Sequence, residues 1–330
     1  MKFTLNILQF LFYLVFLCTK ATFAGTPEIT IINDRKILND SSFYDMVSLD
    51  KDNFILAGKF GIIKTINRNG ITQTIKNPIL GNDIYKIDKW DDENIIACSD
   101  KGYVLQYNLK NKLWQTMQVK GYENSCFYSM CVVNENTAYI CGGKSKIAHS
   151  LKVIPFGFIL ATNDRGKTWE KVYSNPIQMV WSVSVDPISN EINALVYQPN
   201  KSYIYSSKIG SKKFDKKISL GKGLYHDLDY DKNNNWLVVG GKHDGNGTIK
   251  SLDTKKEFNT GLIWSYSKNK NKELFSTSNS SFIFKENNQE KEFILPLKNN
   301  YGLYECAFFD DKKAIIVGSG QSIIFVDFKD

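Results

Sequence analysis

The sequence predicts a single all-β domain, a seven-bladed β-propeller closed by an N-terminal strand that completes the last blade. Three observations predict it. Seven similar units follow one another, no stretch of the mature chain carries the apolar period of a helix, and the last unit lacks a strand that the N-terminal segment can supply. A chain of 330 residues with 42% hydrophobic residues can form one domain of this kind.

Each unit begins with an apolar residue followed by an aromatic one, and successive starts lie 39 to 53 residues apart. The starting pairs are Phe43-Tyr44, Ile84-Tyr85, Phe127-Tyr128, Val180-Trp181, Leu224-Tyr225, Ile263-Trp264 and Leu303-Tyr304. A period of about 40 residues is typical of propeller blades. We therefore expect blades to start near residues 43, 84, 127, 180, 224, 263 and 303, in a domain that covers 25–330.

Short β-rich runs alternate with turns rich in Asp, Asn and Lys inside each unit. In unit one, an alternating run at 44–49 is followed by a turn, an apolar run that ends in Gly58, and a third run at 61–66. This order predicts an antiparallel meander. Because a lone meander cannot bury both of its faces, the seven units are expected to stack around a ring.

The two ends of the domain predict how the ring closes. Unit seven stops at Asp330 after three strands, and the segment 28–32 is a spare strand ahead of unit one. We expect this strand to complete the last blade, since an open edge would invite aggregation.

The first 24 residues predict a signal peptide that is cleaved after Ala24. Lys2 precedes an apolar run at 7–18, which is short for a membrane span, and small residues lead to the cleavage site. An uncleaved anchor is the alternative. We expect a periplasmic or secreted protein with no membrane span after cleavage. Its formal charge of +8 falls to +6 without Lys2 and Lys20, and with no basic run we expect no nucleic-acid partner.

Five cysteines remain after cleavage, at Cys98, Cys126, Cys131, Cys141 and Cys306. An odd number cannot all pair within one chain. We interpret them as buried thiols, with a bridge from Cys141 to Cys131 or to Cys98 as the alternative.

The segment 161–169 matches the Asp-box pattern Ser/Thr-x-Asp-x-Gly-x-Thr-Trp. The matching residues are Thr162, Asp164, Gly166, Thr168 and Trp169. We expect a tight turn in which Asp164 bonds turn amides, Gly166 provides a permissive backbone and Trp169 packs into the sheet. The segment 65–70 of unit one is a weaker copy at the matching place. Such a turn is structural and is not expected to carry chemistry.

Together with this motif, the units resemble the bacterial neuraminidase repeat (BNR) and YVTN-like propellers, and among them the photosystem II stability/assembly factor family. The runs 54–63 and 237–240 fit that family well, whereas units four and six fit it poorly. The resemblance implies a lumenal or periplasmic assembly factor, without implying photosynthesis.

The sequence shows no catalytic apparatus. A sialidase needs three arginines that converge on a carboxylate. The chain has three arginines in all, of which Arg165 belongs to the Asp-box turn, Arg68 to its weaker copy, and Arg35 to neither. We therefore do not expect a sialidase.

Acids follow three of the aromatic starts, at Asp45, Asp227 and Glu305, and we interpret them as surface or turn residues. A glycosidase-like enzyme that uses channel carboxylates remains the alternative function. The histidines show no metal-ligand spacing, and we expect neither a metal site nor a cofactor; they are His149, His226 and His243.

The unit starts predict a binding face at one mouth of the central channel. The aromatic residues expected there are Tyr44, Tyr85, Tyr128, Trp181, Tyr225, Trp264 and Tyr304. The loops between second and third strands add the lysines Lys59, Lys101, Lys144, Lys146, Lys201 and Lys242. Aromatic rings can hold a peptide or a sugar, and lysines favour an acidic partner. The alternatives are that the rings only pack between blades and that the lysines are placed by chance.

Unit three also carries an insertion at 144–157, the first choice for mutagenesis because extra loops on a rigid scaffold often carry function. Taken together, we expect a monomeric, non-catalytic binding or assembly propeller whose channel mouth engages a protein segment or an anionic glycan.

Overall fold

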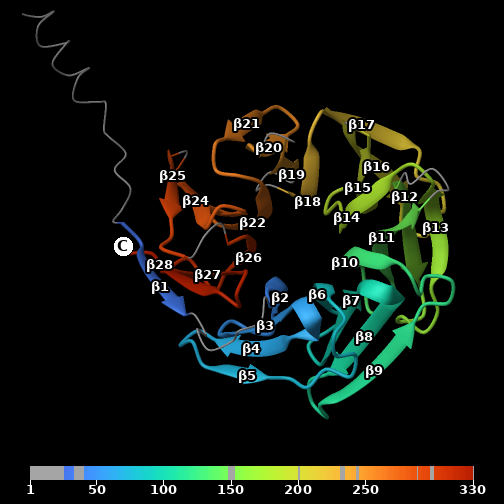
Figure 1. Ribbon diagram of the computed structural model, residues 1–330, viewed down its shortest axis with the longest axis horizontal. Helices are drawn as coiled ribbons and strands as arrows, with labels where there is room; N and C mark the ends of the chain where they lie inside the picture. The colour runs from blue at the N-terminus through green and yellow to red at the C-terminus, as the bar shows by residue number, and fades with distance from the viewer. Residues whose placement is uncertain are drawn as a thin grey trace, which may run out of the picture.

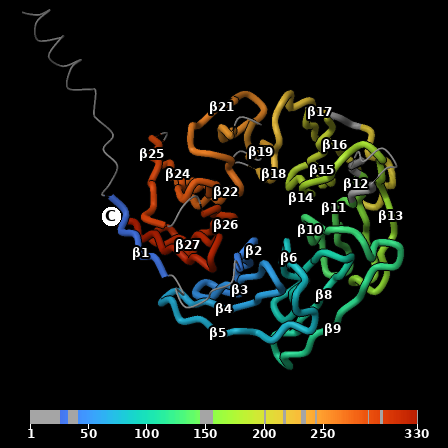
Figure 2. The backbone as a smooth tube through the Cα atoms, in the orientation of Figure 1, coloured from blue at the N-terminus to red at the C-terminus, as the bar shows by residue number. Residues whose placement is uncertain are grey.

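The computed structural model describes residues 26–32, 41–147, 153–199, 201–230, 235–242, 245–287, 289–297 and 301–329. These residues form seven four-stranded antiparallel sheets arranged in a ring (Figure 1). The backbone makes one circuit of the ring, so that the first and last strands lie side by side (Figure 2). The predicted all-β, seven-bladed architecture is confirmed.

In each of the first six blades the four strands follow in chain order from the centre of the ring outward. Blade one contains β2 (Phe43–Ser48), β3 (Asn53–Gly58), β4 (Ile63–Asn67) and β5 (Thr72–Thr74). Blade two contains β6 (Ile84–Lys89), β7 (Asn94–Ser99), β8 (Tyr103–Asn108) and β9 (Leu113–Gln118). Blade three contains β10 (Cys126–Val132), β11 (Ala138–Ile147), β12 (Val153–Thr162) and β13 (Glu170–Asn175). Short 3₁₀ turns, η1 (Lys59–Gly61) and η2 (Asp100–Gly102), follow β3 and β7.

The remaining blades repeat the plan. Blade four contains β14 (Met179–Val185), β15 (Glu191–Gln198), β16 (Lys201–Lys208) and β17 (Lys216–Gly221). Blade five contains β18 (Leu224–Tyr230), β19 (Trp236–Gly241), β20 (Gly247–Ser251) and β21 (Lys255–Phe258). Blade six contains β22 (Ile263–Asn269), β23 (Lys272–Thr277), β24 (Ser281–Glu286) and β25 (Gln289–Ile294). Blade seven contains β26 (Leu303–Phe308), β27 (Lys313–Gly318), β28 (Ile323–Asp327) and, outermost, β1 (Glu28–Ile32).

The outer strand of blade seven comes from the other end of the chain. β1 pairs antiparallel with β28, from Glu28 opposite Asp327 to Ile32 opposite Ile323. Ile29 and Ile31 pack on the core between blades six and seven, and Ile32 packs on the core between blades seven and one. Each end of the chain thus contributes strands to one sheet.

Every innermost strand has a register shift near its start. In blade one, Phe43 pairs with Gly58 and Asp45 with Ala57, so Tyr44 is left as a bulge between them. The other six innermost strands skip one residue in the same way. A bulge of this kind bends the strand and re-aims the side chain of the extra residue.

Glycine opposite the bulge permits a close approach of the backbone. A Cβ atom added to Gly58 would lie 1.9 Å from the carbonyl oxygen of Ser42, and one added to Gly142 would lie 2.0 Å from that of Cys126. Gly240 and Gly318 have the same contact in blades five and seven. This explains why the apolar second strand of many units ends in glycine.

The hydrophobic core lies between neighbouring blades. One cluster joins blades seven and one through Phe43, Leu56, Ile315, Val317 and Phe325, all nearly or fully buried. The five cysteines that follow residue 24 are all free thiols, and three of them are buried in these layers. Within the described residues no helix is long and apolar enough to cross a membrane.

The predicted insertion of unit three is mainly strand. β11 and β12 extend past their neighbours, with pairs from Lys144 opposite Phe156 to Ile147 opposite Val153. Because consecutive residues of the two strands stay paired over this stretch, the insertion forms a hairpin arm. The predicted signal segment, together with His149 and His243, lies outside the described residues.

Candidate functional site at the channel mouth

The seven bulged residues meet at one end of the channel and form a closed aromatic ring. Its members are Tyr44, Tyr85, Tyr128, Trp181, His226, Trp264 and Tyr304, and each contacts the next around the circle. Centroid distances between neighbours run from 4.2 Å for His226 and Trp264 to 5.8 Å for Tyr85 and Tyr128. Six of these seven residues are those that the unit starts predicted.

The seventh predicted aromatic, Tyr225, does not belong to the ring. It pairs with Gly240, is only 1% exposed and packs between blades four and five, where it takes the place that Phe43 has in blade one. The bulged residue of unit five is therefore His226, one residue later than the Leu224-Tyr225 pair suggested. The interval to the glycine could have shown this, because Tyr225 precedes Gly240 by 15 residues, as Phe43 precedes Gly58.

His226 is a neutral member of the ring. Burial lowers the pKa of this imidazole to about 4, so it carries no charge at neutral pH. Both ring nitrogens are buried without a hydrogen-bond partner among the described residues. His226 lies in β18, and the rings of Trp181 and Trp264 flank it on either side.

A polar layer lies directly under the aromatic ring. It is formed by the residue that follows each bulge: Asp45, Lys86, Ser129, Ser182, Asp227, Ser265 and Glu305. The aromatic ring and six members of this upper polar layer enclose a cavity of about 450 Å³, which we call the chamber. Asp45, Asp227 and Glu305 are thus channel residues, not the surface or turn acids that we expected.

Lys86 is the centre of an ion network in the chamber. Its Nζ lies 2.8 Å from Asp45 Oδ1 and 3.8 Å from Glu305 Oε2, so one ammonium serves carboxylates of blades one and seven. Asp45 is 1% exposed, and its second oxygen accepts a hydrogen bond from the Ile87 amide at 2.6 Å. Despite the cost of burial, these two carboxylates raise the pKa of Lys86 well above its usual value.

The other two acids of the chamber differ from Asp45. Burial raises the pKa of Glu305 well above its usual value, while the Ser265 hydroxyl and the Cys306 amide donate to its Oε1. Burial likewise raises the pKa of Asp227 to about 6. A carboxyl group held out of water resists ionisation, and for Glu305 burial outweighs the attraction of Lys86.

Two more acids, Asp88 and Asp229, lie further along the innermost strands of blades two and five. They belong to a second set, which we call the lower layer and which lies two residues beyond the upper polar layer on the same face of each strand: Val47, Asp88, Cys131, Ser184, Asp229, Ser267 and Ala307. Burial raises the pKa of both Asp88 and Asp229. The described residues include no cluster of His, Cys, Asp or Glu suited to a metal ion.

The predicted lysines occupy the second-to-third strand connections, at the end of the blades where the inner strands begin. Lys59 and Lys101 lie in η1 and η2, and Lys201 begins β16 with an exposed side chain. Lys101 donates to Asn82 Oδ1 at 2.8 Å, and Lys242 forms an ion pair with Glu257. Two of these cations are therefore already engaged by the protein itself.

The hairpin arm carries the other two lysines. Lys144 Nζ lies 5.8 Å from the centroid of the Phe156 ring, and Lys146 stands opposite Ile154 in the ladder.

Side chains of the turn between β12 and β13 accept hydrogen bonds from the turn's own amides. Asp164 Oδ1 accepts from the Thr168 amide at 2.9 Å, and Thr162 Oγ1 accepts from the Gly166 amide at 2.9 Å. Gly166 has a φ of +76°, which few other residues adopt without strain. Trp169 packs against the core between blades two and three.

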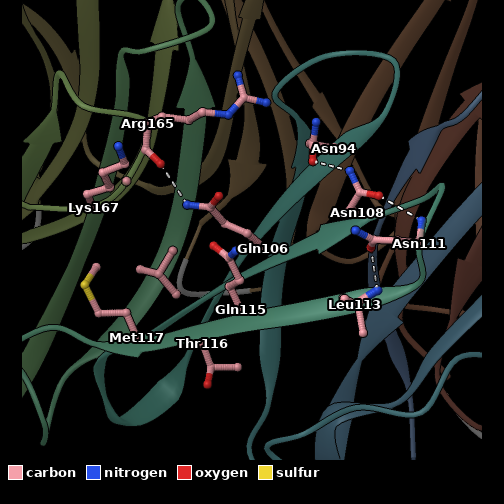
Figure 3. A pocket seen from close by; sticks show the side chains of 12 residues that line it. Asn94, Gln106, Asn108, Asn111, Leu113, Gln115, Thr116, Met117, Arg165 and Lys167 are labelled. Carbon is pink, nitrogen blue, oxygen red and sulfur yellow. Dashed lines mark hydrogen bonds between the residues drawn. The ribbon is translucent and has the colours of Figure 1, made fainter.

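A second cavity of about 360 Å³ lies beside this turn, against the outer strands of blade two (Figure 3). Amide side chains line it, and several are already bonded to the protein. Gln106 Nε2 donates to the Arg165 carbonyl at 2.9 Å and Asn108 Nδ2 donates to Asn94 Oδ1 at 2.8 Å. Its charged lining residues are Arg165 and Lys167, and the sequence predicted no chemistry for it.

Comparisons with known proteins found similar structures but no similar sequences. No protein-family model and no curated protein matches the chain. Among solved structures, YCF48 bound to D1 peptide has a TM-score of 0.67 at 12% identity, covering 93% of this chain and 98% of that one. YCF48 from Cyanidioschyzon merolae has a TM-score of 0.63 at 12% identity, covering 91% and 98%. Virginiamycin B lyase from Staphylococcus aureus has a TM-score of 0.66 at 11% identity, covering 92% and 100%. At such low identity these similarities establish a seven-bladed propeller and nothing finer.

Proposed function

We propose that this protein is an exported binding propeller that engages a segment of a partner protein at the channel mouth, in an assembly role. The observation that carries the proposal is the closed aromatic ring above a polar chamber of about 450 Å³. Aromatic rings with polar groups beneath them are typical of binding sites, where they provide contact area and orientation. The structural similarity to a YCF48 bound to D1 peptide supports a peptide ligand.

An anionic glycan is a weaker candidate. The lysines at the mouth would attract it, but Asp45, Asp227 and Glu305 would repel its acidic groups inside the chamber. A protein segment can suit both the lysines at the mouth and the acids of the chamber. Its acidic residues would lie near Lys59 and Lys201, and a side chain that is not acidic would lie over the chamber.

Export belongs to the same proposal and rests on the first 24 residues. The signal peptide is tested by sequencing the N-terminus of the protein from its native cells, which should begin at Gly25. A chain that retains Met1 in a soluble fraction of the cytoplasm would contradict export.

Selection from a random peptide library tests the binding function. Selected peptides should lose about tenfold or more in affinity on the single variants Tyr85→Ala and Trp264→Ala, which lie in different parts of the aromatic ring. They should keep their affinity on Ile188→Ala, because Ile188 is exposed in the turn between β14 and β15, at the opposite end of the blades. Urea unfolding shows whether each variant is folded. Equal binding by folded ring variants would contradict the proposal.

A glycosidase-like enzyme is the second candidate, and one observation favours it. Asp45 and Glu305 face the chamber from adjacent blades, and the raised pKa of Glu305 is what a general acid requires. Against it, Asp45 is almost fully buried and both of its oxygens already accept bonds from Lys86 and Ile87. Hydrolysis of aryl glycosides that is abolished in Glu305→Gln would favour the enzyme over the binding protein.

A further inference from the structure

Acidic side chains outnumber basic ones along the innermost strands. Asp45, Asp227 and Glu305 belong to the upper polar layer, and Asp88 and Asp229 belong to the lower one. Among the described residues of these two layers, Lys86 is the one cation. A low-dielectric site with more acidic than basic groups favours a ligand that brings positive charge, because a nearby cation also stabilises the ionised form of a buried acid.

The charge is unevenly distributed around the channel. Lys86 is occupied by Asp45 and Glu305, at 2.8 and 3.8 Å. Asp227 belongs to blade five and forms no ion pair among the described residues. Its contacts are the Leu228 amide at 2.9 Å and the Ser182 hydroxyl at 3.5 Å. The raised pKa of Asp227 is the consequence, because a buried carboxylate without a close counter-ion is costly to ionise.

The part of the aromatic ring next to Asp227 suits a cation. His226 precedes Asp227 in the strand, and its ring lies 5.6 Å from that of Trp181 and 4.2 Å from that of Trp264. Indole rings attract cations more strongly than other aromatic side chains, within about 6 Å of the centroid. His226 stays neutral at pH 7, so it adds no repulsion. Its two buried nitrogens also have unmet hydrogen-bonding capacity beside the chamber.

We infer that the chamber receives a positively charged side chain, lysine or arginine, from the bound protein segment, and that Asp227 is its counter-ion. This inference rests on the proposed function and names the residue type by which the segment is recognised. The chamber, at about 450 Å³, lies towards the small end of ligand sites and has room for one long side chain. The stem of such a side chain passes through the aromatic ring, while its charged group reaches the upper polar layer.

Small probes test the inference independently of any peptide. The probes are n-butylammonium and n-butylguanidinium as the cations, n-butanol as the neutral analogue and butyrate as the anion. Isothermal titration should show millimolar binding of the two cations, at least tenfold weaker binding of butanol, and none of butyrate. Binding of butanol as tight as that of butylammonium would overturn the inference.

The variant Asp227→Asn tests the assigned counter-ion. It should weaken butylammonium binding by about tenfold and leave butanol unaffected. The control is Asp253→Asn, an exposed acid between β20 and β21, which should leave all four affinities unchanged. Because Asp227→Asn removes a buried charge, it should not destabilise the fold, and urea unfolding separates lost binding from lost structure. Unchanged butylammonium binding in Asp227→Asn would overturn the assignment.

The peptides selected for the proposed function separate the two ideas. If replacing a lysine of a selected peptide with norleucine lowers its affinity for the wild type but hardly for Asp227→Asn, the inference is supported. Peptides that need the aromatic ring but bind equally well with norleucine would overturn the inference and leave the binding function standing. Binding of butylammonium with no selectable peptide would support the cation site and contradict the proposed function.

Discussion

Arg68 of blade one forms an ion pair with Asp310 of blade seven, with Nη1 2.5 Å from Oδ2. Its guanidinium carbon also lies 6.0 Å from the centroid of the Phe309 ring. Arg165 of blade three repeats this arrangement with blade two. It forms an ion pair with Asp91, and its guanidinium carbon lies 5.7 Å from the centroid of the Trp90 ring. In both cases an arginine in the turn before the outer strand joins the first turn of the preceding blade. The two turns therefore fasten neighbouring blades at the end opposite the chamber.

Arg165→Ala should lower the free energy of unfolding by about 1 kcal/mol. The variant loses the ion pair with Asp91, the contact with Trp90 and the hydrogen bond to the Glu135 carbonyl at 3.2 Å. Both charged groups are about a third exposed, so screening keeps the value small. Urea unfolding measures it, and Lys167→Ala, exposed in the same turn, should cost almost nothing. Equal losses in the two variants would mean that the arginine does not fasten the blades.

The closing strand gives a second prediction. Ile31→Asp should destabilise the protein by about 2 kcal/mol and promote self-association, because it removes an apolar contact and loosens the strand that covers β28. Thr30→Asp adds the same charge to the exposed face of β1 and is the matched control. Urea unfolding and light scattering measure the two effects. A Thr30→Asp variant that behaves like Ile31→Asp would show that the charge, not the lost packing, is responsible.

The sequence predicted the blades well because a blade is a local structure. Its turns and alternating runs are contiguous, and the spare segment 28–32 could be matched to the strand that unit seven lacks. Blade five begins at Leu224 as expected, but its bulged residue was misassigned, because Leu224-Tyr225 and Tyr225-His226 both fit an apolar residue followed by a ring. The two pairs are distinguished by Gly240, which follows Tyr225 by 15 residues and pairs with it across the sheet.

The chamber could not be predicted because its residues come from different blades. Lys86 was not considered, although it occupies the same place in its unit as Asp45 and Glu305 do in theirs. Acids next to turns are common, and nothing in the linear order shows that three units bring their charges to one point. Alignment of the units on their bulges would have placed Lys86 among the acids.

Lys86→Met should destabilise the protein by about 3 kcal/mol at pH 7. The substitution leaves Asp45 and Glu305 buried without their cation, while Asp45 keeps its bond from the Ile87 amide. Lys201→Met removes an exposed lysine and should cost little. Adding Glu305→Gln to Lys86→Met should recover part of the loss, because a neutral amide needs neither a counter-ion nor the uptake of a proton at pH 7. Urea unfolding of the single and double variants checks both statements, and a double variant less stable than Lys86→Met would contradict the network.

Asp227 gives the stability of the protein a predictable dependence on pH. Burial raises its pKa from 3.8 when unfolded to about 6 when folded, against the attraction of Lys86 and with the repulsion of Asp229 and Asp45. The folded state therefore holds a proton that the unfolded state releases, so this group lowers stability as pH rises from about 4 to 6. Asp227→Asn lacks this loss. It should match the wild type below pH 4 and exceed it by up to about 3 kcal/mol at pH 7, whereas Asp253→Asn should follow the wild type throughout. Urea unfolding from pH 4 to pH 7 measures the difference in stability between Asp227→Asn and the wild type. A difference that stays constant over this range would show that Asp227 does not change its pKa from about 4 to about 6 on folding.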